Sequence, residues 1–159
     1  MADYVIPFEN LRNTDVGSVG GKNASLGEMI SQLTQKEIRV PTGFATTAFA
    51  FQEFLKHDDL GNQITKELDG LDINDVQKLA ASGKKIRNWI METPFPEKLD
   101  SSIEEEYSNL TQRSSEGMTF AVRSSATAED LPDASFAAQQ ESFLNIQGIE
   151  NIKKAIKEV

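Results

Sequence analysis

The stretch that decides the fold of this chain is Phe120-Ala-Val-Arg-Ser-Ser-Ala-Thr-Ala-Glu-Asp-Leu-Pro-Asp-Ala-Ser-Phe-Ala-Ala-Gln-Gln-Glu-Ser-Phe-Leu-Asn-Ile146. It opens with an apolar run at 119–122 that predicts a strand, and residues 143–146 predict a strand that returns. Between them, Arg123 leads into a long segment of small and hydroxylated residues. Small side chains let backbone N–H groups approach a phosphate, and an arginine fork can donate two parallel hydrogen bonds to one. The stretch therefore predicts a phosphate-binding loop, with an ordinary hairpin loop and a salt-bridged Arg123 as the alternative.

Composition excludes several classes of protein. The 159 residues suffice for one domain with a core, and 38% hydrophobic with 26% charged residues fits neither a disordered nor a membrane-spanning chain. A net charge of −9 argues against a nucleic-acid surface, which needs clustered Lys and Arg. The absence of cysteine excludes disulfides, thiolate metal sites and a cysteine nucleophile. The first residues have no basic region followed by a long apolar run, so we expect a cytoplasmic protein without a secretory signal.

Hydrophobic periodicity predicts an α+β fold, in the order strand, helix, strand, several helices, strand, loop, strand and helix. The first two strands are predicted at 4–8 and 39–45, and Thr46-Thr47 is predicted to cap the helix that follows the second. Asp72 is predicted to cap a longer helix. The helix over 149–159 lacks a stop signal, which suggests that the natural chain continues. Apolar residues three and four apart mark the helices: Leu26, Met29, Ile30 and Leu33; Ala48, Phe51, Phe54 and Leu55; Leu60, Ile64 and Leu68; Ile73, Val76, Leu79, Ile86 and Ile90; Leu99, Ile103, Tyr107 and Leu110; Ile152 and Ile156.

A second candidate anion site lies at Val19-Gly-Gly-Lys-Asn23, where a helix is predicted to begin. Free N–H groups and the helix dipole at such a position favour negative charge, and Lys22 adds a cation. The spacing is not that of the common P-loop, GxxxxGK[ST], and a plain Gly-Gly turn is the alternative. The one histidine, His57, stands among charged residues and is predicted to be solvated rather than catalytic.

Three motifs together carry a family resemblance. They are Val19-Gly-Gly-Lys-Asn-Ala-Ser-Leu-Gly-Glu-Met29, Val40-Pro-Thr-Gly-Phe-Ala-Thr-Thr47 and Phe120-Ala-Val-Arg-Ser-Ser-Ala-Thr-Ala-Glu-Asp-Leu-Pro132. In this order they resemble the amino-terminal region of the phosphoenolpyruvate synthase family, which is related to pyruvate, phosphate dikinase and rifampicin phosphotransferase. The resemblance implies that residues 1–159 are the amino-terminal part of an ATP-grasp nucleotide-binding domain, a small sheet packed with several helices.

The implied function is that of the ATP-binding part of a larger enzyme. That enzyme converts ATP, pyruvate and water to AMP, phosphoenolpyruvate and phosphate through a phosphohistidine. His57 does not lie in a phosphohistidine motif, so no catalytic residue is expected in this chain, and the chain alone is expected to be inactive. A phosphohistidine domain and a pyruvate-binding barrel are the expected partners. The alternatives are a related phosphotransferase acting on phosphate, an antibiotic or a glucan, a stand-alone nucleotide-binding module, and a scaffold protein.

The resemblance also assigns residues that bind the ATP phosphates. Lys22 and Arg123 match the family's phosphate-contacting lysine and arginine. Ala138 and Ser142 belong to the matching phosphate loop, where the family usually has glycine and often threonine. If the backbone there needs a positive φ, Ala138 costs roughly 1 kcal/mol.

Magnesium is implied as the companion of ATP, with its acidic ligands expected beyond Val159. Glu129 and Asp130 are therefore predicted to stabilise their own loop rather than to bind metal. Part of an ATP-grasp fold in isolation should expose apolar surface, so a homodimer is expected. Nucleic-acid and membrane partners are not expected.

Overall fold

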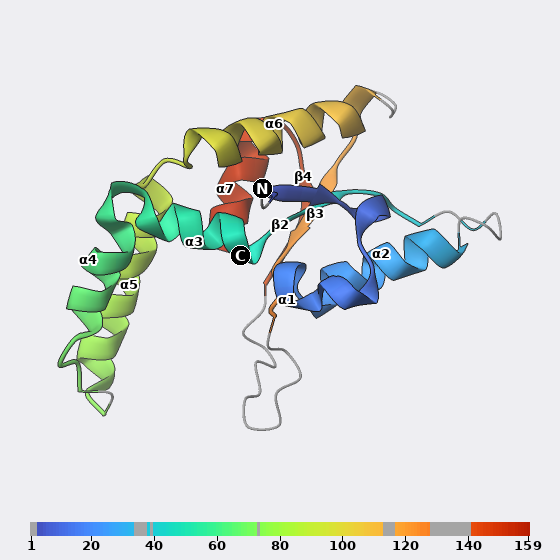
Figure 1. The fold of residues 1–159 in the computed structure, drawn as a ribbon. Helices are drawn as coiled ribbons and strands as arrows, with labels where there is room; N and C mark the ends of the chain where they lie inside the picture. The colour runs from blue at the N-terminus through green and yellow to red at the C-terminus, as the bar shows by residue number, and fades with distance from the viewer. Residues whose placement is uncertain (1–2, 34–37, 39, 73, 113–116, 128–140) are drawn as a thin grey trace.

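The computed structural model describes residues 3–33, 38, 40–72, 74–112, 117–127 and 141–159, and it confirms the α+β class (Figure 1). Helices surround two separate antiparallel sheets of two strands each. The elements are β1 (Val5–Pro7), the 3-10 helices η1 (Phe8–Asn10) and η2 (Asn13–Asp15), α1 (Val16–Val19), α2 (Gly21–Leu33), β2 (Phe44–Thr46), α3 (Ala48–Lys56), the 3-10 helix η4 (His57–Asp59), α4 (Leu60–Leu68), α5 (Val76–Glu92), α6 (Glu97–Gln112), β3 (Phe120–Arg123), β4 (Ser142–Ile146) and α7 (Ile149–Glu158).

The first sheet pairs β1 with β2, with Ile6 opposite Ala45. The strand predicted at 39–45 is shorter than expected, because β1 turns into η1 at Phe8 and offers no further partner. Thr46 is the last strand residue rather than part of a cap. Thr47 alone caps α3, and its hydroxyl accepts a hydrogen bond from the Ala50 N–H at 3.1 Å.

The second sheet is the predicted hairpin of β3 and β4. Phe120 lies opposite Ile146 and Val122 opposite Phe143, so β4 has one extra residue between the two pairs. Asn145 in this bulge has φ of 59°, a conformation that asparagine tolerates better than most residues. A bulge bends the strand and increases its twist.

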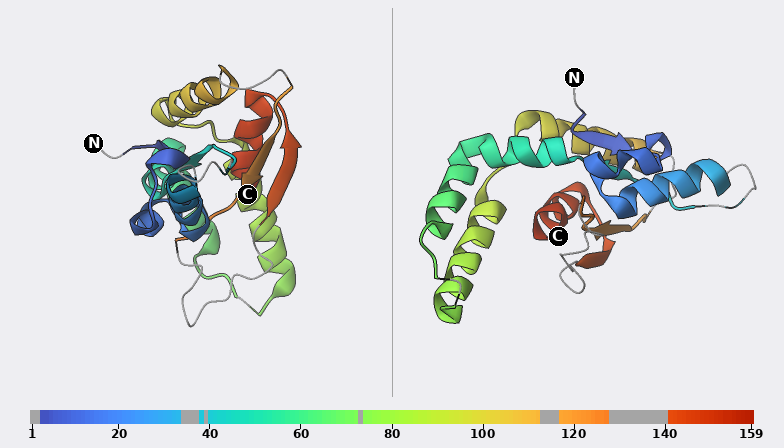
Figure 2. Two further views of the ribbon diagram at one scale, coloured as in Figure 1. Left: turned by 90° about the vertical axis from the view of Figure 1, so that its right-hand side faces the viewer. Right: turned by 60° about the horizontal axis from the view of Figure 1, so that its bottom comes forward.

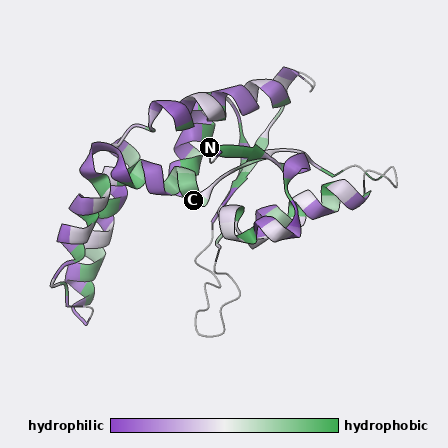
Figure 3. Cartoon of the chain, viewed as in Figure 1, coloured by the Kyte–Doolittle hydropathy of each residue, from purple (hydrophilic) through white to green (hydrophobic). Residues whose placement is uncertain are grey.

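Two buried clusters hold the fold together. One joins α3, α4 and α6 and consists of Ala50, Phe54, Leu60, Leu99 and Ile103. The other joins the start of the chain to α1, α2 and β2 and consists of Leu11, Val19, Ala24 and Ala45. Colouring by hydropathy shows β1 as strongly apolar, whereas the outer faces of the helices are largely polar (Figure 3). Among the described residues, no helix is long and apolar enough to span a membrane.

Helices α4 and α5 form a hairpin that projects from the body (Figures 1 and 2). Glu67 joins the two helices, because it binds Lys85 Nζ at 2.6 Å and accepts from Ser82 Oγ at 2.9 Å. Two predictions for this region were wrong. The cap of α5 is Asp75, whose carboxylate accepts from the Lys78 N–H, and not Asp72. Val76 is 73% exposed rather than on the buried side, because it lies at the far end of the projecting hairpin.

Helix α7 returns to the body and is fixed by two lysines. Lys153 Nζ lies 2.7 Å from a carboxylate oxygen of Asp100 and 2.7 Å from one of Glu104, both on α6. Lys157 Nζ donates to the backbone oxygens of Met91 and Thr93 at the carboxyl end of α5, where such groups lack helical partners. The helix closest to the end of the chain is thus tied to both α5 and α6.

Candidate functional site

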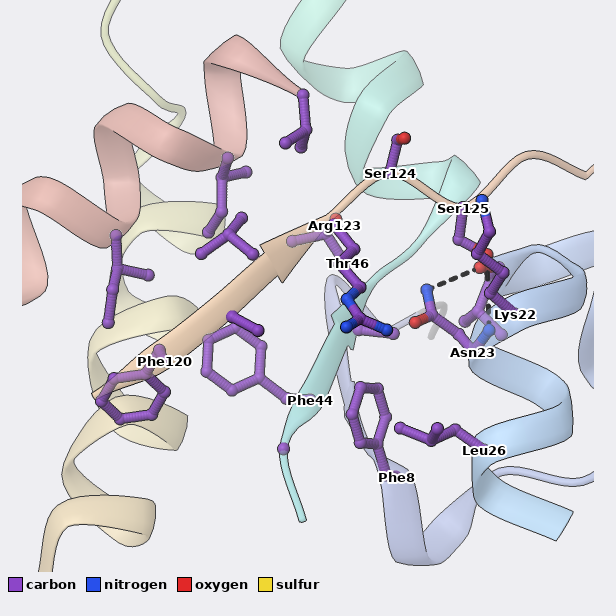
Figure 4. Close-up of a pocket in the computed structure, with 18 of the residues that line it drawn as sticks. Phe8, Lys22, Asn23, Leu26, Phe44, Thr46, Phe120, Arg123, Ser124 and Ser125 are labelled. Carbon is purple, nitrogen blue, oxygen red and sulfur yellow. Dashed lines mark hydrogen bonds between the residues drawn. The ribbon is translucent and has the colours of Figure 1, made fainter. Parts of the chain in front are cut away.

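A cavity of about 1350 Å³ lies between α2, β2, α3 and the β3–β4 hairpin (Figure 4). Most of its lining is apolar or small. Its charged side chains are Lys22, Arg123, Lys157 and Glu158. The three cations outnumber the one carboxylate, so the side chains of the lining carry a net positive charge, whereas the whole chain carries a net charge of −9. The charged side chains of the cavity therefore favour an anionic ligand.

Arg123 is the last residue of β3, and its side chain extends toward α2 and β2 (Figure 4). The strand supplies a rigid base, because β3 is paired with β4 up to this residue. The guanidinium is exposed and makes no hydrogen bond or ion pair with any residue that the structure describes. The alternative interpretation of Arg123 as a salt-bridge residue therefore finds no support within the described part of the chain.

Lys22 is the second residue of α2 and lies beside Ser125 (Figure 4). The predicted Gly-Gly turn is confirmed at its first residue. Gly20 separates α1 from α2 with φ of 82°, a conformation that costs glycine little. Gly21 is already the first residue of α2, so Lys22 is held by a helix rather than by a loop.

The segment after Arg123 lies directly against the start of α2. The Gly21 N–H donates to the carbonyl oxygen of Ala126 at 3.2 Å, and the Asn23 N–H donates to Ser125 Oγ at 3.4 Å. A Cβ on Gly20 would lie 2.3 Å from Ser125 Oγ and 2.7 Å from the Ser125 carbonyl carbon. These contacts bring together the two motifs that the sequence singled out, and with them Lys22 and Arg123.

The third cation of the cavity is already engaged within the protein. Lys157 Nζ bonds to the two backbone oxygens described above and lies 4.9 Å from the centre of the Phe95 ring. Burial lowers the pKa of Lys157 below the ordinary lysine value. Lys22 and Arg123 are the cavity cations that come from the two motifs that the sequence singled out.

The other predicted site residues are distributed differently. Ala138, Glu129 and Asp130 lie outside the described residues, so their predicted roles stay predictions. Ser142 lies opposite Arg123 in the β3–β4 ladder but does not line the cavity, and its phosphate-binding role also stays a prediction. His57 is partly exposed at the turn between α3 and α4, with Nε2 3.7 Å from Asp58 Oδ2, and is not among the residues that line the cavity.

Sequence reasoning missed part of the apolar lining. Phe51 and Phe54 belong to the same predicted apolar stripe and both line the cavity, but Phe51 is 58% exposed whereas Phe54 is buried. Both residues fit the same helical stripe, so periodicity alone cannot separate them. Leu144, next to the bulge, is 60% exposed and also lines the cavity. No sequence signal predicted this arrangement, because it depends on where the β3–β4 hairpin packs.

Comparison with known proteins gives a consistent result. Residues 16–159 match the family model described as pyruvate phosphate dikinase, AMP/ATP-binding domain. The chain is 60% identical over 161 aligned positions to the phosphoenolpyruvate synthase of Neisseria meningitidis, covering 100% of this chain and 20% of that protein. It is 52% identical to the phosphoenolpyruvate synthase of Escherichia coli, covering 98% of this chain and 19% of that protein. A probable phosphoenolpyruvate synthase of Methanocaldococcus jannaschii is 45% identical over 97% of this chain and 13% of that protein.

The chain thus spans about a fifth or less of the length of these relatives. The family match covers α1 to α7 and includes both motifs that meet at the cavity. The chain belongs to the family of pyruvate phosphate dikinase AMP/ATP-binding domains.

Proposed function

We propose that this chain is the amino-terminal part of an ATP-grasp nucleotide-binding domain in a phosphoenolpyruvate synthase, and that Lys22 and Arg123 bind the phosphates of ATP. The observation that carries the proposal is the meeting of these two cations at one cavity, through the contact of the segment after β3 with the start of α2. The family match and the names of the relatives support the same nucleotide and the same enzyme.

The chemistry fits the geometry. A nucleotide triphosphate carries several negative charges, and phosphoryl transfer is catalysed mainly by positioning and by neutralising charge. Lys22 would supply a point charge from a helix, and Arg123 a planar fork from the end of a strand. The apolar lining around them, which includes Phe44 and Phe51, would exclude water and strengthen both interactions.

The proposed enzyme transfers phosphate from ATP to one of its own histidines and then to pyruvate. We place that histidine, the pyruvate site and the magnesium ligands outside this chain, so that the isolated chain binds nucleotide without catalysis. Magnesium, when bound, would neutralise charge on the phosphates. Among the described residues, no group of three or more His, Cys, Asp or Glu side chains gathers that could hold a metal ion.

The test is calorimetric titration of ATP and Mg²⁺ into this chain and into Lys22→Ala and Arg123→Ala. Each substitution should weaken binding by about 1–3 kcal/mol, the range for a lost charge-assisted hydrogen bond. Lys66→Ala, on the exposed face of the projecting α4, is a matched control that should leave the affinity unchanged. If both site variants bind ATP as tightly as the wild type, the assignment of these two cations is wrong.

A related phosphotransferase with another acceptor would use the same nucleotide site. Sequencing of the reading frame beyond Val159 separates the candidates: a phosphohistidine motif and a pyruvate-binding barrel support the synthase, and an early stop codon supports a stand-alone module. The exposed Phe51 and Leu144 at the cavity also favour association of the isolated chain as a homodimer. Sedimentation over a wide concentration range should show the dimer, and a monomer throughout would contradict this.

A further inference from the structure

Helix α2 begins without a capping side chain of its own. The first N–H groups of a helix have no partner within it and are usually satisfied by a Ser, Thr, Asp or Asn immediately before. Here that position is Gly20, which has no side chain. The Ala24 N–H donates to the Gly20 oxygen at 3.1 Å, which closes the first turn of the helix.

The missing cap comes from the other end of the sequence. Ser125 Oγ accepts from the Asn23 N–H across a sequence separation of 102 residues, and the Ala126 oxygen accepts from the Gly21 N–H. Gly20 permits this contact, because a Cβ there would overlap both the hydroxyl and the backbone of Ser125. Two orphan donors of α2 are thereby satisfied by the segment that follows β3.

We propose that Ser125 is a positioning residue, whose cap on α2 sets the separation and orientation of Lys22 and Arg123. Lys22 lies between the two capped N–H groups, and Arg123 lies two residues before Ser125. The cap can fix the positions of both Lys22 and Arg123 without a contact between the two side chains. The consequence for the ligand rests on the proposed function: the phosphates are bound by side chains, because Gly21 and Asn23 already donate to the protein's own loop.

This arrangement differs from the helix-terminus anion site that the Gly-Gly-Lys sequence indicated. In that kind of site the first backbone N–H groups point at the ligand. In this chain an oxygen of Ser125 and an oxygen of Ala126 stand where the anion would stand. The dipole of α2 still favours negative charge nearby, but the direct donors are Lys22 and Arg123.

The first test measures the cap without any nucleotide. Ser125→Ala removes the acceptor, and Ser125→Thr retains it. Ser31→Ala removes a hydroxyl from the far end of the same helix, where Ser31 Oγ donates to the Glu28 oxygen at 3.1 Å. Amide hydrogen exchange at Asn23 should become roughly fivefold faster in Ser125→Ala, as expected for a lost N-cap, and stay unchanged in the other two variants. Unchanged exchange in Ser125→Ala would show that Ser125 does not cap α2.

The second test measures the positioning itself. The chain has no cysteine, so the double substitution Lys22→Cys and Arg123→Cys places two spin labels at unique positions. In the labelled double variant with Ser125 unchanged, the distribution of distances between the two labels should be narrow. It should stay narrow when Ser125→Thr or Ser31→Ala is added, and it should become clearly broader when Ser125→Ala is added. A global loss of stability would not broaden it below the unfolding transition. A distribution that is the same with and without the Ser125 hydroxyl would overturn the proposal.

Nucleotide binding then separates this inference from the function on which it rests. Ser125→Ala should weaken binding of ATP and Mg²⁺ by roughly fivefold, with affinity restored in Ser125→Thr. If the exchange and distance results are as expected but the wild-type chain binds no ATP, the proposed function fails and the positioning role stands. If the wild-type chain binds ATP and Ser125→Ala binds it equally well, the positioning role of Ser125 is refuted and the proposed function stands.

Discussion

Gly27, in the middle of α2, offers a sharp test of how the structure holds this helix. Ala in place of a helical glycine normally stabilises by roughly 1 kcal/mol, because alanine has the higher helix propensity. A Cβ at Gly27, however, would lie 2.4 Å from the Leu11 Cβ, 2.7 Å from the Leu11 oxygen and 2.8 Å from the Phe8 oxygen. Two of these three atoms are backbone, and Leu11 is completely buried, so none of them can swing aside.

The size of the effect follows from these distances. Carbon atoms in contact prefer a separation of about 3.5–4.0 Å, so α2 would have to move by about 1 Å. Overpacking of this kind costs about 1–3 kcal/mol, and the rigid neighbours here favour about 3 kcal/mol. After the gain in helix propensity, Gly27→Ala should lower the free energy of unfolding by about 2 kcal/mol. For a chain of this size that corresponds to a Tm about 4–8 °C lower.

Gly83 in α5 is the matched control, because it is also a helical glycine. A Cβ there meets only the end of the Arg87 side chain, at 3.3 Å. Gly83→Ala should therefore raise the free energy of unfolding by up to about 1 kcal/mol. Urea unfolding followed by circular dichroism and by the fluorescence of Trp89 gives both values and tests for two-state behaviour. A Gly27→Ala variant as stable as Gly83→Ala would refute the close packing of α2 on Leu11.

Two further substitutions test contacts elsewhere in the fold. Burial by itself would lower the pKa of Lys153, but its hydrogen bonds to Asp100 and Glu104 outweigh burial and raise the pKa. The ion pairs therefore stabilise the folded chain fully below the ordinary lysine pKa. This contribution is lost as the pH rises through the raised value. Lys153→Met should lower the free energy of unfolding by about 1–2 kcal/mol at pH 7, since the carboxylates left behind are partly exposed. Urea unfolding should show that the difference in this free energy from the wild type shrinks toward strongly alkaline pH. A difference that is constant with pH would contradict the ion-pair origin. Thr47→Ala should lower the free energy of unfolding by about 2 kcal/mol, because the buried hydroxyl both caps α3 and donates to a backbone oxygen at the start of the chain. Thr47→Ser keeps the hydroxyl and should retain most of the stability. Equal losses in the two variants would show that the methyl group and not the hydroxyl matters.

Much of the secondary structure could be predicted because its signals are local. The stripe at Leu99, Ile103 and Leu110 depends on neighbours within two turns, and all three residues are buried in α6. The cap at Thr47 and the hairpin of β3 and β4 also depend on short stretches of sequence. One local prediction failed: Asp72 was expected to cap α5, and Asp75, three residues later, is the cap in the structure.

The candidate site shows the same division between local and long-range information. The motifs around Lys22 and Arg123 are visible in the sequence. Their meeting is implied by the family resemblance alone, because residues separated by 102 positions carry no periodic relation. Phe51 and Phe54 illustrate the limit within one helix: both match the apolar stripe and both line the cavity, but Phe51 is exposed whereas Phe54 is buried.

The sequence by itself therefore determined the α+β class, most helices and the hairpin, since each depends on the chemistry of adjacent residues. Only the tertiary structure decided that Ser125 caps α2, that Gly20 and Gly27 must lack side chains, and that Phe51 faces the cavity. The physical reason is that contacts between distant segments are selected by steric fit and by the need to satisfy buried N–H groups. Neither requirement leaves a pattern along the chain.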